Sequence, residues 1–170
     1  VDMGGGTHPS VCLWFTQDPS DGTIYVYNEF DTKDVTSEFV EGTKMVAGLE
    51  RYNMGFGDPA MFHSKHDHIY DESPAQMFSR AGLYLTPAHN AREIGWRNLK
   101  TWLHWKAGQE PRLKILRRCR NLTETIAIQQ YVPGKYDLDT DGQDDFVDAL
   151  RYGTVHVEVG YIYNTEGRKE

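Results

Sequence analysis

Apolar and polar residues alternate along two early segments of the chain, a pattern typical of strands with one buried face. The first segment runs from Val11 to Phe15 and the second from Thr23 to Phe30, where Tyr25 and Tyr27 mark one side. The run Asp18–Gly22 between them contains proline, serine and glycine, which favour turns. We therefore predict an antiparallel hairpin.

Beyond the hairpin, helical and extended patterns follow one another. A helix is predicted from about Thr36 to Tyr52, because Phe39, Val46 and Leu49 recur at helical spacing. The further predicted elements, in chain order, are a short strand ending at Gly57-Asp58-Pro59, a helix over Pro74–Ala81, a strand over Leu83–Thr86, a helix over Ala91–Trp105, a strand over Leu113–Leu116, and a helix opened by a capping box of Asn121 and Glu124.

The last predicted element is a strand or hairpin from Thr154 to Tyr163, where Val155, Val157 and Val159 alternate with mostly polar residues. Antiparallel strands followed by alternating helices and strands give a mixed α/β order. We see no repeat and no domain boundary. The sequence thus predicts one α/β domain over residues 1–170, with a mixed sheet flanked by helices and a late β-hairpin.

The most informative polar feature is an acidic run from Asp137 to Asp148, which holds six aspartates within twelve positions. Asp144, Asp145 and Asp148 lead into an apolar-periodic stretch, so all three carboxylates can share one end of a helix. Like charges this close raise one another's pKa unless a cation sits among them. A hard divalent cation with oxygen ligands meets that need, and a solvated acidic turn that caps a helix is the alternative.

The same run also matches part of a calcium loop of the EF-hand type. Asp137, Asp139, Asp141, Gly142 and Asp145 fit positions 1, 3, 5, 6 and 9 of such a loop. Position twelve, however, is an aspartate rather than the usual glutamate, and the preceding Tyr-Val-Pro-Gly breaks the helix that should lead in. A calcium-binding module therefore remains an alternative.

Two other aspartates lie at the ends of predicted strands, because the opening Val-Asp-Met-Gly-Gly-Gly is typical of a strand end that breaks into a glycine turn, and Asp58 ends the short strand before Pro59. Asp2 and Asp58 each stand close to a chain-breaking glycine or proline. Functional groups of open α/β sheets gather at the carboxyl ends of strands. We therefore expect Asp2, Asp58 and a carboxylate of the late acidic helix to converge on one edge of the sheet around divalent metal.

The charge of the chain is unevenly distributed. The net charge is −7, yet nine Lys/Arg and only two acids lie between Arg92 and Arg120. A basic zone beside an acidic cluster suits a metal site next to a polyanion groove, whereas a solvated helix face is the simpler alternative. The predicted DNA-binding residues of this stretch are Arg92, Arg97, Lys100, Arg112, Lys114 and Arg117. Cys12 and Cys119 lie far apart without metal-ligand spacing, so we expect two buried thiols.

Four segments, taken in order, resemble the nuclease domain of the large terminase subunits of tailed phages. They are Gly57-Asp58-Pro59-Ala60, Gly82–Asn90 with Gly95-Trp96, Pro111–Ile115 and Asp139–Tyr152. The resemblance implies an RNase H-like fold whose acidic residues hold divalent metal. Matched by position, the metal-holding and catalytic residues are Asp2, Asp58 and Asp148. Members often carry histidine three residues before the last of these, where this chain has Asp145, so Asp145 is an additional candidate for both roles.

The resemblance further implies a two-metal-ion endonuclease that uses Mg²⁺ or Mn²⁺, two ions per site, to cut concatemeric double-stranded viral DNA during genome packaging. Its partners would be the ATPase motor domain of the same protein, the portal and the small terminase subunit, in the cytoplasm of the infected bacterial host. The chain holds no Gly-x-x-x-x-Gly-Lys-Ser/Thr loop, so we expect it to be a fragment without the motor. Another RNase H-like nuclease, of resolvase or transposase type, stays open. So does the non-catalytic calcium module, which would use neither Asp2 nor Asp58.

Overall fold

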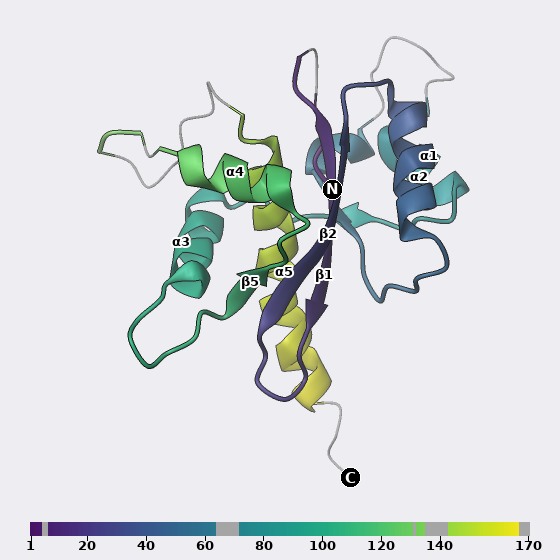
Figure 1. Cartoon of the computed structure of the whole chain (residues 1–170). Helices are drawn as coiled ribbons and strands as arrows, with labels where there is room; N and C mark the ends of the chain where they lie inside the picture. Colours follow the sequence, from purple (N-terminus) through teal and green to yellow (C-terminus); the bar gives the residue numbers. More distant parts are fainter. Residues whose placement is uncertain (5–6, 64–71, 131, 135–142, 167–170) are drawn as a thin grey trace.

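The computed structural model describes residues 1–4, 7–63, 72–130, 132–134 and 143–166, with side chains up to His156 in the last range (Figure 1). Strands β1 (Ser10–Gln17) and β2 (Ile24–Thr32) form an antiparallel hairpin. Strand β5 (Leu113–Ile115) joins β2 in parallel, so the sheet order is β1-β2-β5. The predicted hairpin and mixed sheet are confirmed.

A second, two-stranded sheet is tied to the first by the opening residues of the chain. Strands β3 (Phe56–Gly57) and β4 (Thr86–Pro87) pair in parallel. Asp2 forms a bridge with Val11 of β1, and the carbonyl oxygen of Val1 accepts the amide of Asp58 at 3.0 Å. One short segment thus lies between β1 and the end of β3.

Helices cover both faces of the β1-β2-β5 sheet (Figure 1). On one face lie α1 (Thr36–Ala47), the short 3-10 helix η1 (Pro59–Phe62) and α2 (Pro74–Arg80), packed around Phe39 and Phe78. On the other lie α3 (Arg92–Leu103), α4 (Arg120–Ile128) and α5 (Asp145–Glu166), packed around Trp96, Trp102 and Leu150. Cys12 and Cys119 are free, buried thiols, as expected.

The helix predicted over Thr36–Tyr52 is shorter than expected. It ends at Ala47, because Gly48 adopts a φ of 56°, which ends the helix in a conformation that favours glycine. Of the predicted apolar face only Phe39 is buried, whereas Val46 is 38% exposed and Leu49 fully exposed. The face that packs on the core is made by Phe39, Val40, Thr43 and Ala47.

The predicted late strand or hairpin over Thr154–Tyr163 is wrong, because these residues continue α5. The helix starts earlier on a strong apolar face, with Phe146 and Leu150 buried in the core. The Thr154 hydroxyl donates to the carbonyl of Leu150 at 3.0 Å, a bond that belongs to a helix. Gly153 lets α5 approach β1, since a Cβ there would meet the Phe15 ring at 2.5 Å. The alternating valines of this segment therefore do not form a strand, although β-branched residues at every second position are typical of one.

The predicted capping box of Asn121 and Glu124 is also wrong. Helix α4 begins one residue after Cys119, with no cap from that residue's side chain. Its first amides are satisfied from β2 instead, where Glu29 accepts the amides of Asn121 and Leu122, both at 2.9 Å. None of the helices that the structure describes is long and apolar enough to cross a membrane.

Candidate metal centre

Asp2 is fixed by the backbone of the first strand. Its amide donates to the carbonyl of Val11 at 2.8 Å, and the Val11 amide donates back at 2.9 Å. This pairing extends the sheet and directs a carboxylate into the interior, where Asp2 is only 7% exposed. An ionised carboxylate buried to that extent requires a compensating cation or a proton.

Asp58 reaches the same region from the end of β3. Its backbone amide bonds to Val1, and its Oδ1 accepts the Ala60 amide at 2.8 Å, which caps η1. Pro59 fixes the first turn of η1 and prevents β3 from continuing. Among the described residues, the Oδ2 of Asp58 has no hydrogen-bond partner and is available to a ligand.

The start of α5 contributes three more carboxylates. Asp145 and Asp148 lie one turn apart and are 6% and 9% exposed, while Asp144 is half-buried just before the helix. The amide of Asp148 donates to the carbonyl of Asp144 at 2.8 Å. The positive end of the helix dipole favours negative charge at this position, which offsets part of the repulsion among the three.

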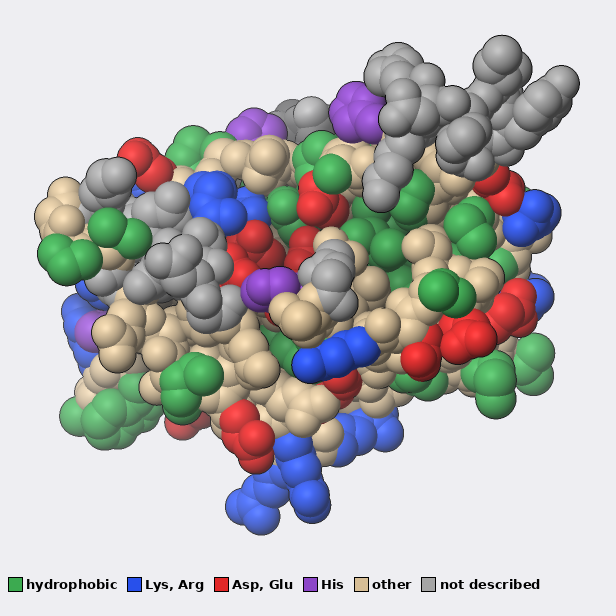
Figure 2. Space-filling view, turned by 90° about the horizontal axis from the view of Figure 1, so that it is seen from above, with side chains coloured by type: hydrophobic (Ala, Val, Ile, Leu, Met, Phe, Trp, Pro, Cys, Tyr) green, Lys and Arg blue, Asp and Glu red, His purple; other side chains and the backbone are tan. Residues whose placement is uncertain are grey.

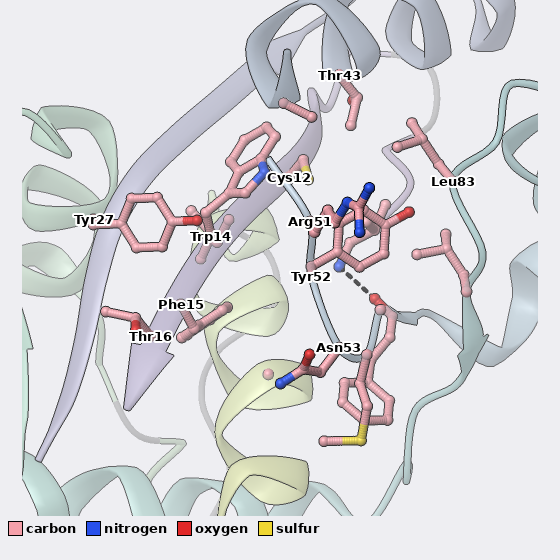
Figure 3. Close-up of a pocket in the computed structure, with 18 of the residues that line it drawn as sticks. Cys12, Trp14, Phe15, Thr16, Tyr27, Thr43, Arg51, Tyr52, Asn53 and Leu83 are labelled. Carbon is pink, nitrogen blue, oxygen red and sulfur yellow. Dashed lines mark hydrogen bonds between the residues drawn. The ribbon is translucent and has the colours of Figure 1, made fainter. Parts of the chain in front are cut away.

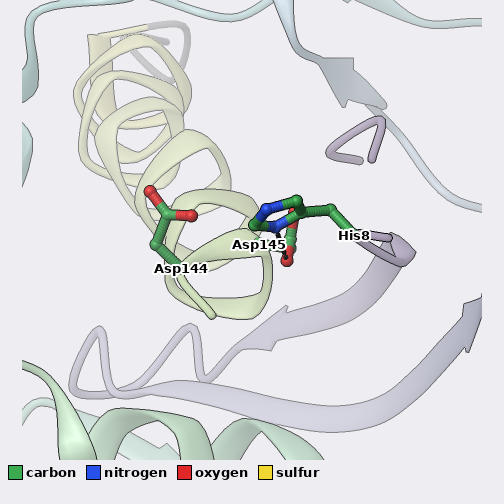
Figure 4. A group of neighbouring side chains, drawn as sticks. All are labelled: His8, Asp144 and Asp145. Atoms are coloured by element: carbon green, nitrogen blue, oxygen red, sulfur yellow. Dashed lines mark hydrogen bonds and ion pairs between the residues drawn. The ribbon is translucent and has the colours of Figure 1, made fainter. Parts of the chain in front are cut away.

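A histidine joins this group from the turn before β1. The Nδ1 of His8 lies 3.2 Å from the Oδ2 of Asp145 (Figure 4). Potential ligand atoms of His8, Asp144 and Asp145 all lie within 4.8 Å of one another, close enough to share one ion. No spacing in the sequence signals His8, because it is 137 residues from Asp145.

The electrostatics link Asp2 and Asp58 to the aspartates of α5. The pKa of Asp2 is raised to about 8, first by burial and then by the charges of Asp148 and Asp58, with Asp145 adding to them. The pKa of Asp144 is raised by burial and by Asp148. Asp2, Asp58, Asp145 and Asp148 therefore share one electrostatic environment. Figure 2 shows acidic side chains together in the middle of one face, beside a histidine and basic side chains.

Two arginines bind the two carboxylate oxygens of Asp148. Arg151 donates from Nε to Oδ1 at 3.1 Å, and Arg92, the first residue of α3, donates from Nη1 to Oδ2 at 3.2 Å. Arg151 is completely buried, and its stem lies against Gly95, where an added Cβ would meet it at 2.5 Å. Gly95 is therefore the residue that allows α3 to pack on this arginine.

The predicted basic stretch is divided between two places. Arg92 lies at the carboxylates, and Arg97 and Lys100 follow it along α3. Lys114 instead pairs in register with Tyr25, which lies opposite Thr16 near the far end of β1. Thr16 is five positions beyond Val11, so that end is about 17 Å away along the strand. Arg112 lies at the same far end, since its carbonyl accepts the amide of Ile24.

A cavity with different chemistry is lined by residues of β1, α1, α2 and α5 (Figure 3). It measures about 1140 Å³ and lies among Trp14, Tyr27, Phe78 and Leu83, with Arg51 as its charged side chain. No aspartate, glutamate or histidine is among its described lining residues. Its described lining residues therefore offer no carboxylate to a divalent cation.

The donor set of the acidic centre fits a hard divalent cation. Carboxylate oxygens are the ligands that Mg²⁺ and Mn²⁺ prefer. Burial and the neighbouring carboxylates raise the pKa of Asp2, and a bound cation would favour its ionised form in place of the proton. The first half of the calcium-loop match, residues 137–142, lies outside the described residues, so the structure provides no test of that alternative.

No protein-family model and no curated protein matches the chain. The nuclease domain of the P22 large terminase matches with a TM-score of 0.66 and 19% identity, over 90% of this chain and 76% of that one. The large terminase nuclease domain of bacteriophage SPP1 with bound Mn matches with a TM-score of 0.57 and 18% identity, over 89% and 80%. The predicted RNase H-like fold, a mixed sheet flanked by helices, is confirmed by these similarities.

Proposed function

We propose that this chain is a metal-dependent endonuclease domain of the large terminase type, which cuts concatemeric double-stranded DNA during viral genome packaging. The supporting observation is a group of carboxylates on a fold shared with two terminase nuclease domains: buried Asp2 beside β1, half-buried Asp58 at the end of β3, and buried Asp145 and Asp148 of α5. The bound Mn of the SPP1 domain supports a divalent cofactor, and Mg²⁺ or Mn²⁺, two ions per site, suits the oxygen donors of this chain.

In this proposal the carboxylates of Asp2, Asp58 and Asp148 hold the metal. Asp145 is the fourth candidate, with His8 and Asp144 beside it. When bound, two divalent ions would activate the attacking water and stabilise the leaving oxygen of the scissile phosphate. Arg151 acts through Asp148, because its buried Nε fixes the orientation of that carboxylate. Asp2 must lose its proton on binding, which links metal affinity to pH.

The basic residues of α3 and of the β5 region are proposed to bind DNA through its phosphates, without reading bases. They are Arg92, Arg97, Lys100, Arg112, Lys114 and Arg117. The ATPase motor domain of the same protein, the portal and the small terminase subunit are the proposed partners. The proposed location is the cytoplasm of the infected bacterial host.

Cleavage of supercoiled plasmid in Mn²⁺, Mg²⁺, Ca²⁺ or EDTA tests the proposal. The parent should nick and linearise the plasmid in Mn²⁺ or Mg²⁺ only. Asp58→Ala should lower the rate by at least about a hundredfold, the scale on which one preorganised catalytic group acts. Asp18→Asn, at the exposed hairpin turn, is the matched control and should cut like the parent. Cleavage by Asp58→Ala at the parental rate would contradict the proposed role of Asp58.

A further inference from the structure

The acidic centre contains two sets of donor atoms with different chemistry. One set consists of three aspartates that offer carboxylate oxygens only, namely Asp2, Asp58 and Asp148. The other set combines the imidazole of His8 with the carboxylates of Asp144 and Asp145, whose potential ligand atoms all lie within 4.8 Å of one another (Figure 4). Of these two sets, only the second offers a nitrogen ligand.

The backbone before β1 brings His8 to the carboxylates. The same short segment holds Asp2, which forms a bridge with Val11. The segment comes back close to itself at Gly4, where an added Cβ would meet the carbonyl oxygens of His8 and Pro9 at 2.3 Å. Pro9 is buried and its ring fixes φ just before the strand begins. His8 therefore enters the centre from the segment that also carries Asp2, with its side chain 42% exposed.

The contact between His8 and Asp145 has the spacing of two neighbouring metal ligands. The Nδ1 of His8 lies 3.2 Å from the Oδ2 of Asp145. Two ligands about 2.1 Å from an octahedral ion lie about 3.0 Å apart when they are adjacent and about 4.2 Å apart when they are opposite. An ion bound to both atoms would therefore require only small movements of these side chains.

The carboxylate of Asp145 is less engaged than that of Asp148. Both oxygens of Asp148 accept hydrogen bonds from arginines, Oδ1 from Arg151 and Oδ2 from Arg92. The described side-chain partner of Asp145 is His8 itself. An ion at Asp145 would therefore convert His8 from a hydrogen-bond partner of this carboxylate into a second ligand beside it.

We propose that His8 is a ligand of the metal centre, and that its imidazole makes one of the two ion positions selective for transition-metal ions such as Mn²⁺ over Mg²⁺. The inference deepens the proposed function and rests on it. Mg²⁺ and Ca²⁺ prefer oxygen donors, whereas imidazole nitrogen is a common ligand of divalent transition metals. The set with oxygen donors alone suits Mg²⁺ and Mn²⁺ alike, so the two positions differ in the ion that they favour.

Pulsed EPR of bound Mn²⁺, without DNA, tests the ligand directly. The parent should show magnetic coupling between the Mn²⁺ and an imidazole nitrogen, because a directly bound nitrogen shares unpaired spin density. His8→Gln keeps a polar group beside Asp145 but binds metals through oxygen, so it should abolish this coupling. His104→Gln, at the exposed C-terminal end of α3, is the matched control and should retain it.

Calorimetric titration with Mn²⁺ and with Mg²⁺ tests the selectivity. His8→Ala should weaken Mn²⁺ binding by at least about tenfold, the scale on which even the outer partners of metal ligands act. Its Mg²⁺ affinity should stay within about twofold of the parental value, because Mg²⁺ uses the oxygen donors. His8→Asp, which supplies a carboxylate in place of the imidazole, should bind both ions without the preference for Mn²⁺.

Mn²⁺ that binds the parent without imidazole coupling would overturn the inference and leave the proposed nuclease function standing. An equal loss of Mn²⁺ and Mg²⁺ affinity in His8→Ala would overturn the selectivity in the same way. Imidazole coupling in a protein that cuts plasmid in no divalent ion would instead support the ligand and contradict the nuclease function. Failure of the parent to bind Mn²⁺ would overturn both.

Discussion

Asp2 is the residue at which burial and charge conflict most directly. It is held by two backbone hydrogen bonds to Val11, so it cannot withdraw from the other carboxylates. Its pKa is raised to about 8, chiefly by burial, which means that the folded protein retains a proton that the unfolded chain would release. Asp2 holds a proton in the metal-free protein and would lose it when a cation binds. The stability of the protein should therefore depend on both pH and divalent metal.

The metal-free protein should lose stability as pH rises from about 4 to about 8. A carboxyl whose pKa is raised on folding stabilises the protein below its unfolded value of about 3.9, and this contribution disappears as pH passes its folded value. Asp2→Asn should remove this pH dependence and raise the melting temperature at pH 8 by a few degrees, at about 2–4 °C per kcal/mol. Thermal unfolding in EDTA between pH 5 and 9 measures it.

Divalent metal should reverse the trend. Mn²⁺ must displace the proton of Asp2, so the melting temperature of the parent should rise more on adding Mn²⁺ at pH 8 than at pH 6. Asp2→Asn should lose most of this rise at both values. A metal-induced shift that is equal at pH 6 and pH 8 would mean that Asp2 is not part of the binding site.

Sequence alone indicates the aspartates of the candidate site but not the residues around them. Asp2 and Asp58 stand at chain breaks, and Asp148 lies in an acidic run, so each has a local signal. His8 and Arg151 have none, because their importance comes from contacts made only after folding. His8 reaches Asp145 across 137 positions, and Arg151 looks like an ordinary helical arginine until its burial is known.

At the scale of elements, the start of α4 shows why local signals fail. Asn121 and Glu124 have the spacing of a capping box, yet the amides of Asn121 and Leu122 are bonded to Glu29 of β2. The carboxylate of Glu29 thus caps the start of α4 and also holds this helix to the sheet. The periodicity of apolar residues and the residues that favour turns predict most elements correctly. Neither contains information about a distant partner such as Glu29, or about the packing that makes α5 helical beyond Thr154.

The α4 cap gives a direct test of stability. Glu29→Ala removes two hydrogen bonds to a helix start, so the free energy of unfolding should fall by about 1–2 kcal/mol, as for loss of a strong cap. Glu124→Ala, which removes the carboxylate of the predicted but unformed box, should change it by less than about 0.5 kcal/mol. Chemical denaturation of the two variants beside the parent provides the measurement. A larger loss of stability in Glu124→Ala than in Glu29→Ala would support the local capping box and contradict the role of Glu29.

At the scale of the whole molecule, one basic stretch of sequence becomes two separate regions. Arg97 and Lys100 extend from the acidic centre along α3, while Arg112 and Lys114 lie about 17 Å away, toward the hairpin turn. Lys114 is also 3.1 Å from Glu110, which holds part of its charge. A net charge of −7 over the chain means that DNA approaches a mostly repulsive surface and must be guided by these regions.

Duplex length should therefore separate the two regions. A duplex of about 8 base pairs extends about 14 Å on each side of the metal centre and reaches only the α3 region, whereas about 20 base pairs reaches both, at 3.4 Å per base pair. Removing Arg97 and Lys100 together should flatten the salt slope by about 1.8 on either duplex, at 0.9 per phosphate contact. Removing Arg112 and Lys114 should flatten it on the longer duplex alone.

The isolated domain should bind in roughly the micromolar range or weaker, so fluorescence anisotropy at low salt is the suitable measurement. Unrelated sequences should give the same slopes, because phosphate contacts carry no base information. If the Arg112 and Lys114 variant lowers the slope on the short duplex as well, DNA crosses the sheet in another direction and the path along α3 is wrong.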